Sequence, residues 1–185
     1  PTEKTYKTWY EDFKNIRILT SDQMKTYPLG KNVTVRPGIS LVSFPTDPNT
    51  YAVEIGGVIR PFEDQIIAQD IYGSDWKKRV IAIPDSFFND YILGEEIQGN
   101  YQLPDGFLFQ SKDTKKYYYK YNNLLWPFQD EKSVLANNLE LKDAVISSLA
   151  FDKRKKEITG LSPKVSDPSA APLKSNADCQ NKKLK

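Results

Sequence analysis

The sequence predicts an α+β protein built from tandem repeats of a small antiparallel β-meander followed by two short helices, with a disordered C-terminal tail. Three observations predict this. The stretch "YAVEIGGVIRPF" returns 66 positions later as "YYYKYNNLLWPF". After each Pro-Phe pair the apolar period changes from that of a strand to that of a helix. Residues 161–185 instead mix Pro, Ser, Ala and Lys, a composition that cannot bury enough apolar surface to fold.

The two similar stretches align without a gap through their Pro-Phe pairs, Pro61-Phe62 and Pro127-Phe128. Further upstream, Gly38 and Gly106 each open a hydrophobic run. We therefore expect residues 38–94 and 106–160 to superpose, with Phe62 and Phe128 turned inward and the second copy the more helical. The alignment also makes equivalent the pairs Tyr51 and Tyr117, Ala52 and Tyr118, Val58 and Leu124, and Ile59 and Leu125.

A partial copy precedes these two. Pro1-Thr2-Glu3 corresponds to Pro61-Phe62-Glu63, and "TYPLG" at 26–30 corresponds to "DYILG" at 90–94, which matches Tyr27 with Tyr91 and Leu29 with Leu93. The predicted organisation is the C-terminal half of a first repeat at 1–30, a complete second repeat at 31–100, a divergent third at 101–160 and a flexible tail at 161–185. We expect the hairpin of the first repeat to lie on the N-terminal side, in a longer parent chain.

Each unit has a readable local plan. In the second repeat, strands are expected around the turn "PTDPN" and around a two-residue loop at Gly56-Gly57, with Pro61 ending the last strand. Ile66, Ile67 and Ile71 have helical spacing, and Gly73 should stop that helix. "RVIAI" should be extended, and residues 84–94 should form a second short helix.

Composition excludes several classes of function. The chain has no His and one Cys, Cys179, which removes the usual catalytic triads, thiolate metal sites and disulfide frameworks. The tail holds five Lys and two Asp, so residues 1–160 hold 21 basic and 22 acidic side chains and offer nucleic acid little attraction. No apolar window approaches the roughly 18 residues of a membrane span. We expect no metal, no cofactor, no nucleic-acid partner and no membrane insertion.

Several motifs of the second repeat resemble a repeat found in exported, mostly uncharacterised proteins of candidate-phylum bacteria. The shared features are a Pro-Gly strand, "TDPNTYAVEIGG", "YGSDW" and "IPDSFFNDYILG". The match is good over residues 1–100 and fades through 101–160, where "YG..W" and "IPD.FF" are not kept. The resemblance implies a modular protein at the bacterial cell surface or outside the cell, and it transfers no catalytic residue.

Aromatic side chains are the strongest candidates for a binding site, in particular Tyr118, Trp126 and Trp76. An exposed row of aromatic rings could stack on sugars or anchor a partner protein. The alternative is that they form the core, because β-rich units favour aromatic residues. Exposure is expected first for Tyr118, whose aligned partner is the small Ala52.

The leading hypothesis is a non-catalytic exported repeat module of a larger surface or secreted protein, with a structural or binding role toward a cell-wall glycan or a surface protein. The alternative is a secreted hydrolase that attacks carbohydrate or peptidoglycan through paired carboxylates. Its candidates are Glu63, Asp64, Glu95 and Glu96, which could equally serve as helix caps and solvated surface groups.

Overall fold

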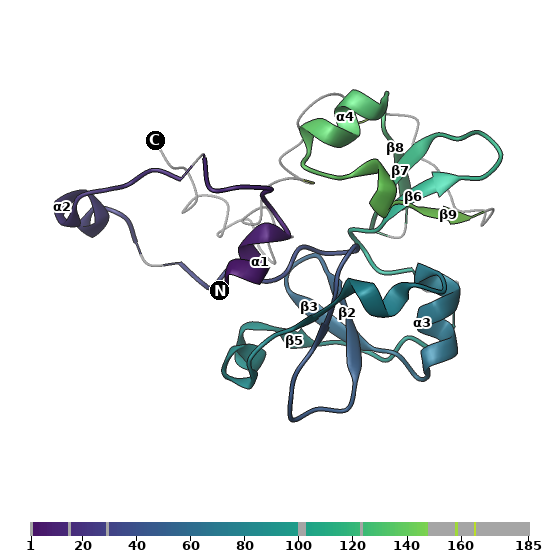
Figure 1. Cartoon of the computed structure of the whole chain (residues 1–185), viewed down its shortest axis with the longest axis horizontal. Coiled ribbons are helices and arrows are strands. Elements are labelled where there is room, and N and C mark those ends of the chain that lie inside the picture. The colour runs from purple at the N-terminus through teal and green to yellow at the C-terminus, as the bar shows by residue number, and fades with distance from the viewer. Residues whose placement is uncertain are drawn as a thin grey trace.

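A computed structural model of the chain describes residues 2–147 except 15, 29, 100–102 and 123, and in addition residues 158 and 165. The fold is mixed α/β, with two mixed sheets and a few short helices (Figure 1). The predicted tail at 161–185 lies outside the described residues apart from Val165.

The first sheet has five strands in the order β4-β1-β2-β3-β5. Its centre is the expected antiparallel meander, and the two outer strands lie parallel to their neighbours. The antiparallel meander is confirmed, whereas the two parallel outer strands were not predicted. The strands are β1 (Leu41–Ser43), β2 (Thr50–Glu54), β3 (Val58–Pro61), β4 (Val80–Ala82) and β5 (Ile92–Leu93).

The second sheet has four strands in the order β8-β7-β6-β9, again with a parallel outer strand. Its strands are β6 (Leu108–Ser111), β7 (Tyr117–Tyr121), β8 (Leu124–Pro127) and β9 (Val145–Ser147). Pro61 and Pro127 end β3 and β8, as expected for a residue without an amide hydrogen. The next residues make parallel bridges, Phe62 to Ile97 and Phe128 to Ile158.

The helices are short. They are α1 (Glu3–Lys7), α2 (Ser21–Lys25), α3 (Gln65–Tyr72), α4 (Glu131–Ala136) and three 3-10 helices, η1 (Trp76–Arg79), η2 (Asp85–Asp90) and η3 (Leu141–Asp143). Asp64 and Asp130 cap α3 and α4 by accepting from backbone amides. Gly73, at φ 86°, ends α3 as predicted.

Two helix predictions are wrong. Residues 84–94 form the 3-10 helix η2 and then strand β5, because pairing with β3 overrides local helix preference there. The second half of the chain is also not the more helical within its described residues. The left-handed Asn138 lies just after Asn137, the C-cap of α4, and Val145–Ser147 pairs with the second sheet as β9.

The hairpin loops differ by one residue, which changes the alignment. Glu54 pairs with Val58, so the first loop has three residues rather than two, whereas Tyr121 pairs directly with Leu124. When the two hairpins are aligned by their strand pairing, Tyr118 therefore corresponds to Tyr51, not to Ala52. A slip of one residue moves every side chain of a strand to the opposite face.

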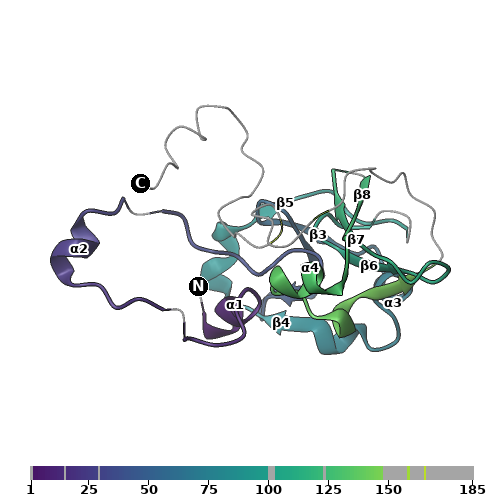
Figure 2. The same ribbon diagram turned by 90° about the horizontal axis from the view of Figure 1, so that it is seen from above.

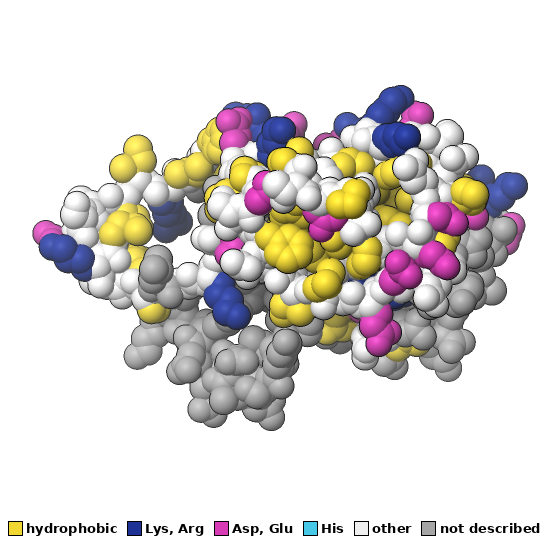
Figure 3. Space-filling view, turned by 90° about the horizontal axis from the view of Figure 1, so that it is seen from below, with side chains coloured by type: hydrophobic (Ala, Val, Ile, Leu, Met, Phe, Trp, Pro, Cys, Tyr) yellow, Lys and Arg dark blue, Asp and Glu magenta, His cyan; other side chains and the backbone are white. Residues whose placement is uncertain are grey.

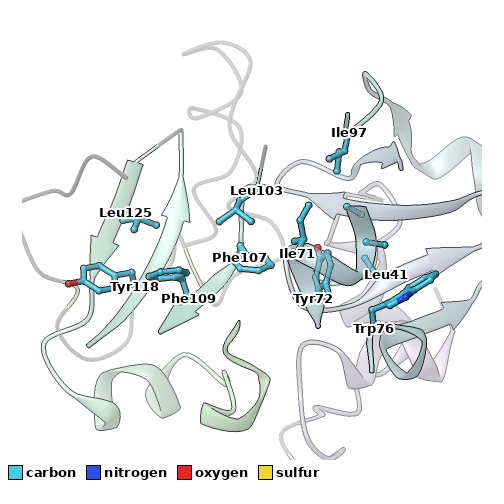
Figure 4. Close-up of a cluster of buried hydrophobic side chains, with 12 residues drawn as sticks. Leu41, Ile71, Tyr72, Trp76, Ile97, Leu103, Phe107, Phe109, Tyr118 and Leu125 are labelled. Atoms are coloured by element: carbon cyan, nitrogen blue, oxygen red, sulfur yellow. The ribbon is translucent and has the colours of Figure 1, made fainter. Parts of the chain in front are cut away.

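One apolar cluster joins the two sheets, and we call it the shared cluster. In Figure 4, Phe109, Tyr118 and Leu125 of the second sheet face Phe107 and Leu103, which in turn meet the side chains of α3. The rings of Tyr72 and Phe107 lie 5.4 Å apart at 73°. Helix α3 thus packs between its own sheet and the next one. The members are Leu41, Ala52, Ala68, Ile71, Tyr72, Trp76, Ile97, Leu103, Phe107, Phe109, Tyr118 and Leu125.

For the strands that follow the hairpin loops, the structure confirms the predicted pairs of equally buried residues. Ile59 and Leu125 are both fully buried, and Val58 and Leu124 are both half-buried. Phe128 is buried, and Phe62 is half-buried against the shared cluster. Both phenylalanines turn inward, as expected.

The two sheets meet backbone to backbone at two glycines. Gly38 and Gly106 have φ of 84° and 95°, and their amides bond to Val53 O at 2.9 Å and Lys120 O at 2.8 Å. A Cβ on Gly38 would overlap the carbonyl group of Gly106, and one on Gly106 would overlap Pro37. Neither position therefore has room for a side chain.

Arg36 lies beside this contact and joins the sheets with hydrogen bonds. Its buried guanidinium donates to the carbonyl oxygens of Asn138 at 2.6 Å, Asn137 at 2.5 Å and Val165 at 3.1 Å. The centroid of the Trp9 ring lies 5.3 Å from Cζ of Arg36. Burial lowers the pKa of Arg36 to about 10, so the group stays cationic at neutral pH.

Tyr72 carries a polar group that burial leaves unsatisfied. Its hydroxyl has no hydrogen-bond partner among the described residues, and its side chain is 4% exposed. Burial raises its pKa well above the ordinary value of about 10. The neutral form is therefore strongly favoured in the folded protein.

We expect Gly38→Ala and Gly106→Ala each to lower the free energy of unfolding by about 3–5 kcal/mol, the sum of backbone strain and overpacking. Gly73→Ala is the matched control, because Gly73 has a similar φ of 86° and open space around it. It should cost only about 1–3 kcal/mol. Urea titration measures all three. Equal losses at the three positions would contradict a steric contact between the sheets.

We expect Tyr72→Phe to raise the free energy of unfolding by about 1 kcal/mol at pH 7, because it removes an unsatisfied buried hydroxyl. In the wild type, the contribution of neutral Tyr72 is complete below pH 10 and is lost above it, since only the unfolded chain then releases the proton. The difference in the free energy of unfolding between Tyr72→Phe and the wild type should therefore grow above pH 10.

The control for Tyr72→Phe is Tyr51→Phe, which removes a 2.6 Å hydrogen bond to Asp47 and should cost roughly 1–2 kcal/mol. Denaturant titrations at pH 7 and pH 11 measure both variants. A Tyr72→Phe protein less stable than the wild type would show that the hydroxyl has a partner.

Candidate functional site

A groove with a volume of about 530 Å³ lies in the described surface beside the first sheet. We call it the motif groove. It lies between the turn after β1 and the 3-10 helix η2, two segments about forty residues apart in the sequence. Its lining residues are Phe44, Thr46, Asp47, Pro48, Asp85, Phe88 and Asn89.

Hydrogen bonds hold the two walls of the groove together. The backbone N–H and the hydroxyl of Thr46 both donate to Oδ1 of Asp85, at 3.2 and 2.7 Å. Beneath them, the rings of Phe44 and Phe88 lie 4.9 Å apart at 74°. The turn and η2 are therefore fixed to each other by a polar contact above an aromatic one.

Asp47 shapes its own turn. Its carboxylate accepts from the Tyr51 hydroxyl at 2.6 Å and from the backbone N–H of Asn49 at 2.8 Å. The Tyr51 hydrogen bond is the main cause that lowers the pKa of Asp47 below its usual range. An ionised acceptor of this kind cannot serve as a general acid at neutral pH.

The groove presents both apolar and polar groups. It offers an aromatic edge at half-buried Phe88, an exposed amide at Asn89 and carboxylate oxygens, a combination that suits polyhydroxyl ligands. Among the described residues, its lining contains no Ser, Cys, Lys or His side chain.

The residues of the motif groove belong to sequence motifs that predict only a turn and a short helix. Asp47 comes from "TDP", and Asp85 and Phe88 come from "IPDSFF". Both motifs occur in the family repeat that the chain resembles. This shared occurrence is the signal that could have predicted contact between the two segments.

The three aromatic residues predicted from sequence do not form one surface. Tyr118 and Trp76 are 4% and 6% exposed and belong to the shared cluster. The prediction of an exposed Tyr118 is wrong, because the register places it on the buried face that carries Tyr51 in the first sheet. Trp126 is half-buried, with its Nε1 donating to Tyr121 O at 3.3 Å. A binding role for Trp126 stays a prediction.

The acids of the hydrolase alternative lie on the surface. Glu63, Glu95 and Glu96 are exposed, and none of them lines the motif groove. Asp64 is used as the N-cap of α3, with Oδ1 accepting from Ile67 N at 2.9 Å. No feature of these carboxylates favours catalysis over the cap and surface roles.

Neither a cluster of metal-binding side chains nor a membrane-spanning helix is present in the described part of the chain. Nowhere in it do three His, Cys, Asp or Glu side chains converge as they would around a metal ion. None of its helices has the length and apolar character needed to cross a bilayer.

Comparison with protein-family models, with curated proteins and with solved structures finds no match for this chain.

Proposed function

We propose that this chain is a non-catalytic repeat module of a larger exported bacterial protein, with the motif groove as its binding surface. The observation that carries the proposal is the common register of the two sheets. Tyr51 opposite Pro61 corresponds to Tyr118 opposite Pro127, and Leu41 opposite Ala52 corresponds to Leu108 opposite Tyr119. Unrelated domains have no reason to share pairings strand by strand.

The order of elements gives further support. In each half a meander runs through a proline into an aspartate-capped helix, a 3-10 helix and a parallel strand that returns to the first strand of the meander. The parallel bridges at Phe62 and Phe128 fall at the same place in both halves.

Packing between the halves is also that of a stacked array. Helix α3 of the first half fills the space against the back of the second sheet, and neither surface would be covered without the other. Repeat units stack in this way because each one buries too little apolar surface alone.

The exported location rests on the family resemblance of residues 1–100. Labelling of the protein on intact cells of its source by an antibody to this segment would test it, and a purely cytosolic signal would oppose it.

The proposed ligand of the motif groove is a cell-wall glycan, because the groove pairs the Phe88 ring with hydrogen-bonding groups of Thr46 and Asn89. The third repeat has "SKDTKK" at the corresponding turn and lacks the "IPD.FF" motif. The second repeat therefore carries the binding function alone among the described residues.

We expect a second copy of residues 38–105, inserted after Asp105, to fold as part of the chain. The added α3 would pack on the following meander as α3 now packs on the second sheet, so unfolding should stay cooperative. The denaturant dependence of the free energy should rise with the added buried surface. Urea titration followed by circular dichroism measures both.

The control for the duplication is a Gly/Ser segment of equal length at the same place, which should leave the denaturant dependence unchanged. Loss of cooperative unfolding in the duplicated chain, with the control still folded, would reject the repeat module.

We expect soluble peptidoglycan fragments to shift the NMR amide signals of Thr46 and Asn89, and Asn89→Ala to weaken binding about fivefold, the equivalent of one hydrogen bond of about 1 kcal/mol. Lys112→Ala, at the corresponding turn of the second half, is the matched control and should bind as the wild type does. Shifts spread evenly over the surface, or none at the groove, would remove the glycan from the proposal.

A further inference from the structure

Residues 10–33, which we call the arm, leave the body of the protein and return to it (Figures 1 and 2). Its helix α2 has a complete capping box between Thr20 and Gln23, yet none of the residues of α2 is buried. Helices this short are not stable in water without packing. Helix α2 therefore has the local signals of an ordered segment, but among the described residues it has no buried residue to stabilise it.

The arm also exposes apolar side chains, and Ile18 is 96% exposed. Yellow groups stand out on the projecting arm in Figure 3. The large apolar residues that are more than a third exposed are Phe13, Ile16, Ile18, Met24, Tyr27 and Val33. Burying such side chains is worth roughly 1.5–3 kcal/mol each, so the arm is suited to contact an apolar surface.

The first sheet contains a segment with the same plan, which we call the strap: residues 80–94, comprising β4, η2 and β5. The arm matches the strap at a constant offset of 64, with "IRIL" at 16–19 over "VIAI" at 80–83 and Tyr27 over Tyr91. At this offset α2 falls on η2. The predicted match of Leu29 with Leu93 involves a residue outside those described.

The strap shows how such a segment packs. Strand β4 runs parallel to β1 at one edge of the meander, and β5 runs parallel to β3 at the other. Between them η2 crosses the sheet, where Phe87 and Phe88 pack with Val42 and Ile59. The strap thus closes both edges and one face of a three-stranded meander.

We propose that the arm is the strap of another β-meander, one whose two edge strands are unpaired. Ile16 and Ile18 would form the parallel edge strand that β4 provides, and Met24 would pack on the sheet as Phe88 packs on Phe44. The topology places this meander on the N-terminal side of α1, since in the first sheet β3 leads directly into α3. This inference rests on the repeat organisation proposed above.

The experiment supplies the missing partner from the chain itself. Residues 36–60 are joined directly ahead of Pro1, so that β3 of the added copy leads into α1 as it does into α3. We expect trypsin cleavage after Arg17 and Lys25, both now exposed, to slow tenfold or more. A Gly/Ser segment of equal length is the control and should leave the cleavage rates unchanged.

A disulfide tests the register independently of proteolysis. Leu41 lies opposite Val80, so Leu41→Cys in the added meander should cross-link within one chain to Ile16→Cys, in a Cys179→Ser background. Ile18→Cys, two residues away, should not. If residues 36–60 fail to fold ahead of Pro1, the second meander, residues 104–126, provides the same measurement through Leu108→Cys.

Equal cleavage of the two fusions, or no preference for Ile16→Cys, would overturn the inference. A cross-link between two chains would instead assign the arm to a second copy and would also overturn it. The duplication of residues 38–105 leaves the arm unchanged. A stable duplicated chain, together with an arm that stays unprotected in the fusion with residues 36–60, would therefore reject this inference and leave the repeat module standing.

Discussion

The arrangement of the two halves depends on the contact between Gly38 and Gly106, where backbone meets backbone with no space for a side chain. Both glycines also use their amides to hold the edge of their own meander, so each belongs to a sheet and to the junction at once. With the backbones this close, Phe107 reaches Tyr72 and Arg36 reaches the carbonyl end of α4. The shared cluster and the Arg36 hydrogen bonds both follow from this one approach. Neither glycine could be replaced without separating the sheets.

The junction combines apolar packing with a buried cation that has no carboxylate bonded to it among the described residues. Arg36 donates instead to carbonyl oxygens, which carry the negative end of the peptide dipoles at the end of α4. Carbonyl partners satisfy the guanidinium and also fix its direction, since its N–H groups form a rigid fork. The apolar cluster supplies most of the attraction between the halves. Arg36 adds a directional constraint that apolar contacts cannot provide.

In the repeat organisation that we propose, the motif groove and the arm use similar strap segments in two ways. In the first sheet, η2 is held against the turn by Thr46 and Asp85, and the polar residues around that contact leave a groove at the surface. In the arm, α2 has no such contact among the described residues. A strap on its meander thus forms one wall of a surface groove, whereas a strap without one exposes apolar side chains. The proposed binding and docking surfaces therefore depend on whether the strap is paired.

Sequence alone determined the features that depend on neighbouring residues. The strands around the turns, the proline ends of β3 and β8, helix α3 with its Gly73 stop, and the matched burial of Ile59 and Leu125 all follow from local chemistry and periodicity. Tertiary structure decided what depends on distant partners. Residues 92–93 and 145–147 became parallel edge strands because free strands lay beside them, and the motif groove arose because two separated motifs met. Because the first hairpin loop has three residues rather than two, Tyr118 corresponds in register to the buried Tyr51 and not to Ala52. Side-chain direction alternates with every residue along a strand, so only the observed pairing could decide which face each aromatic ring would occupy.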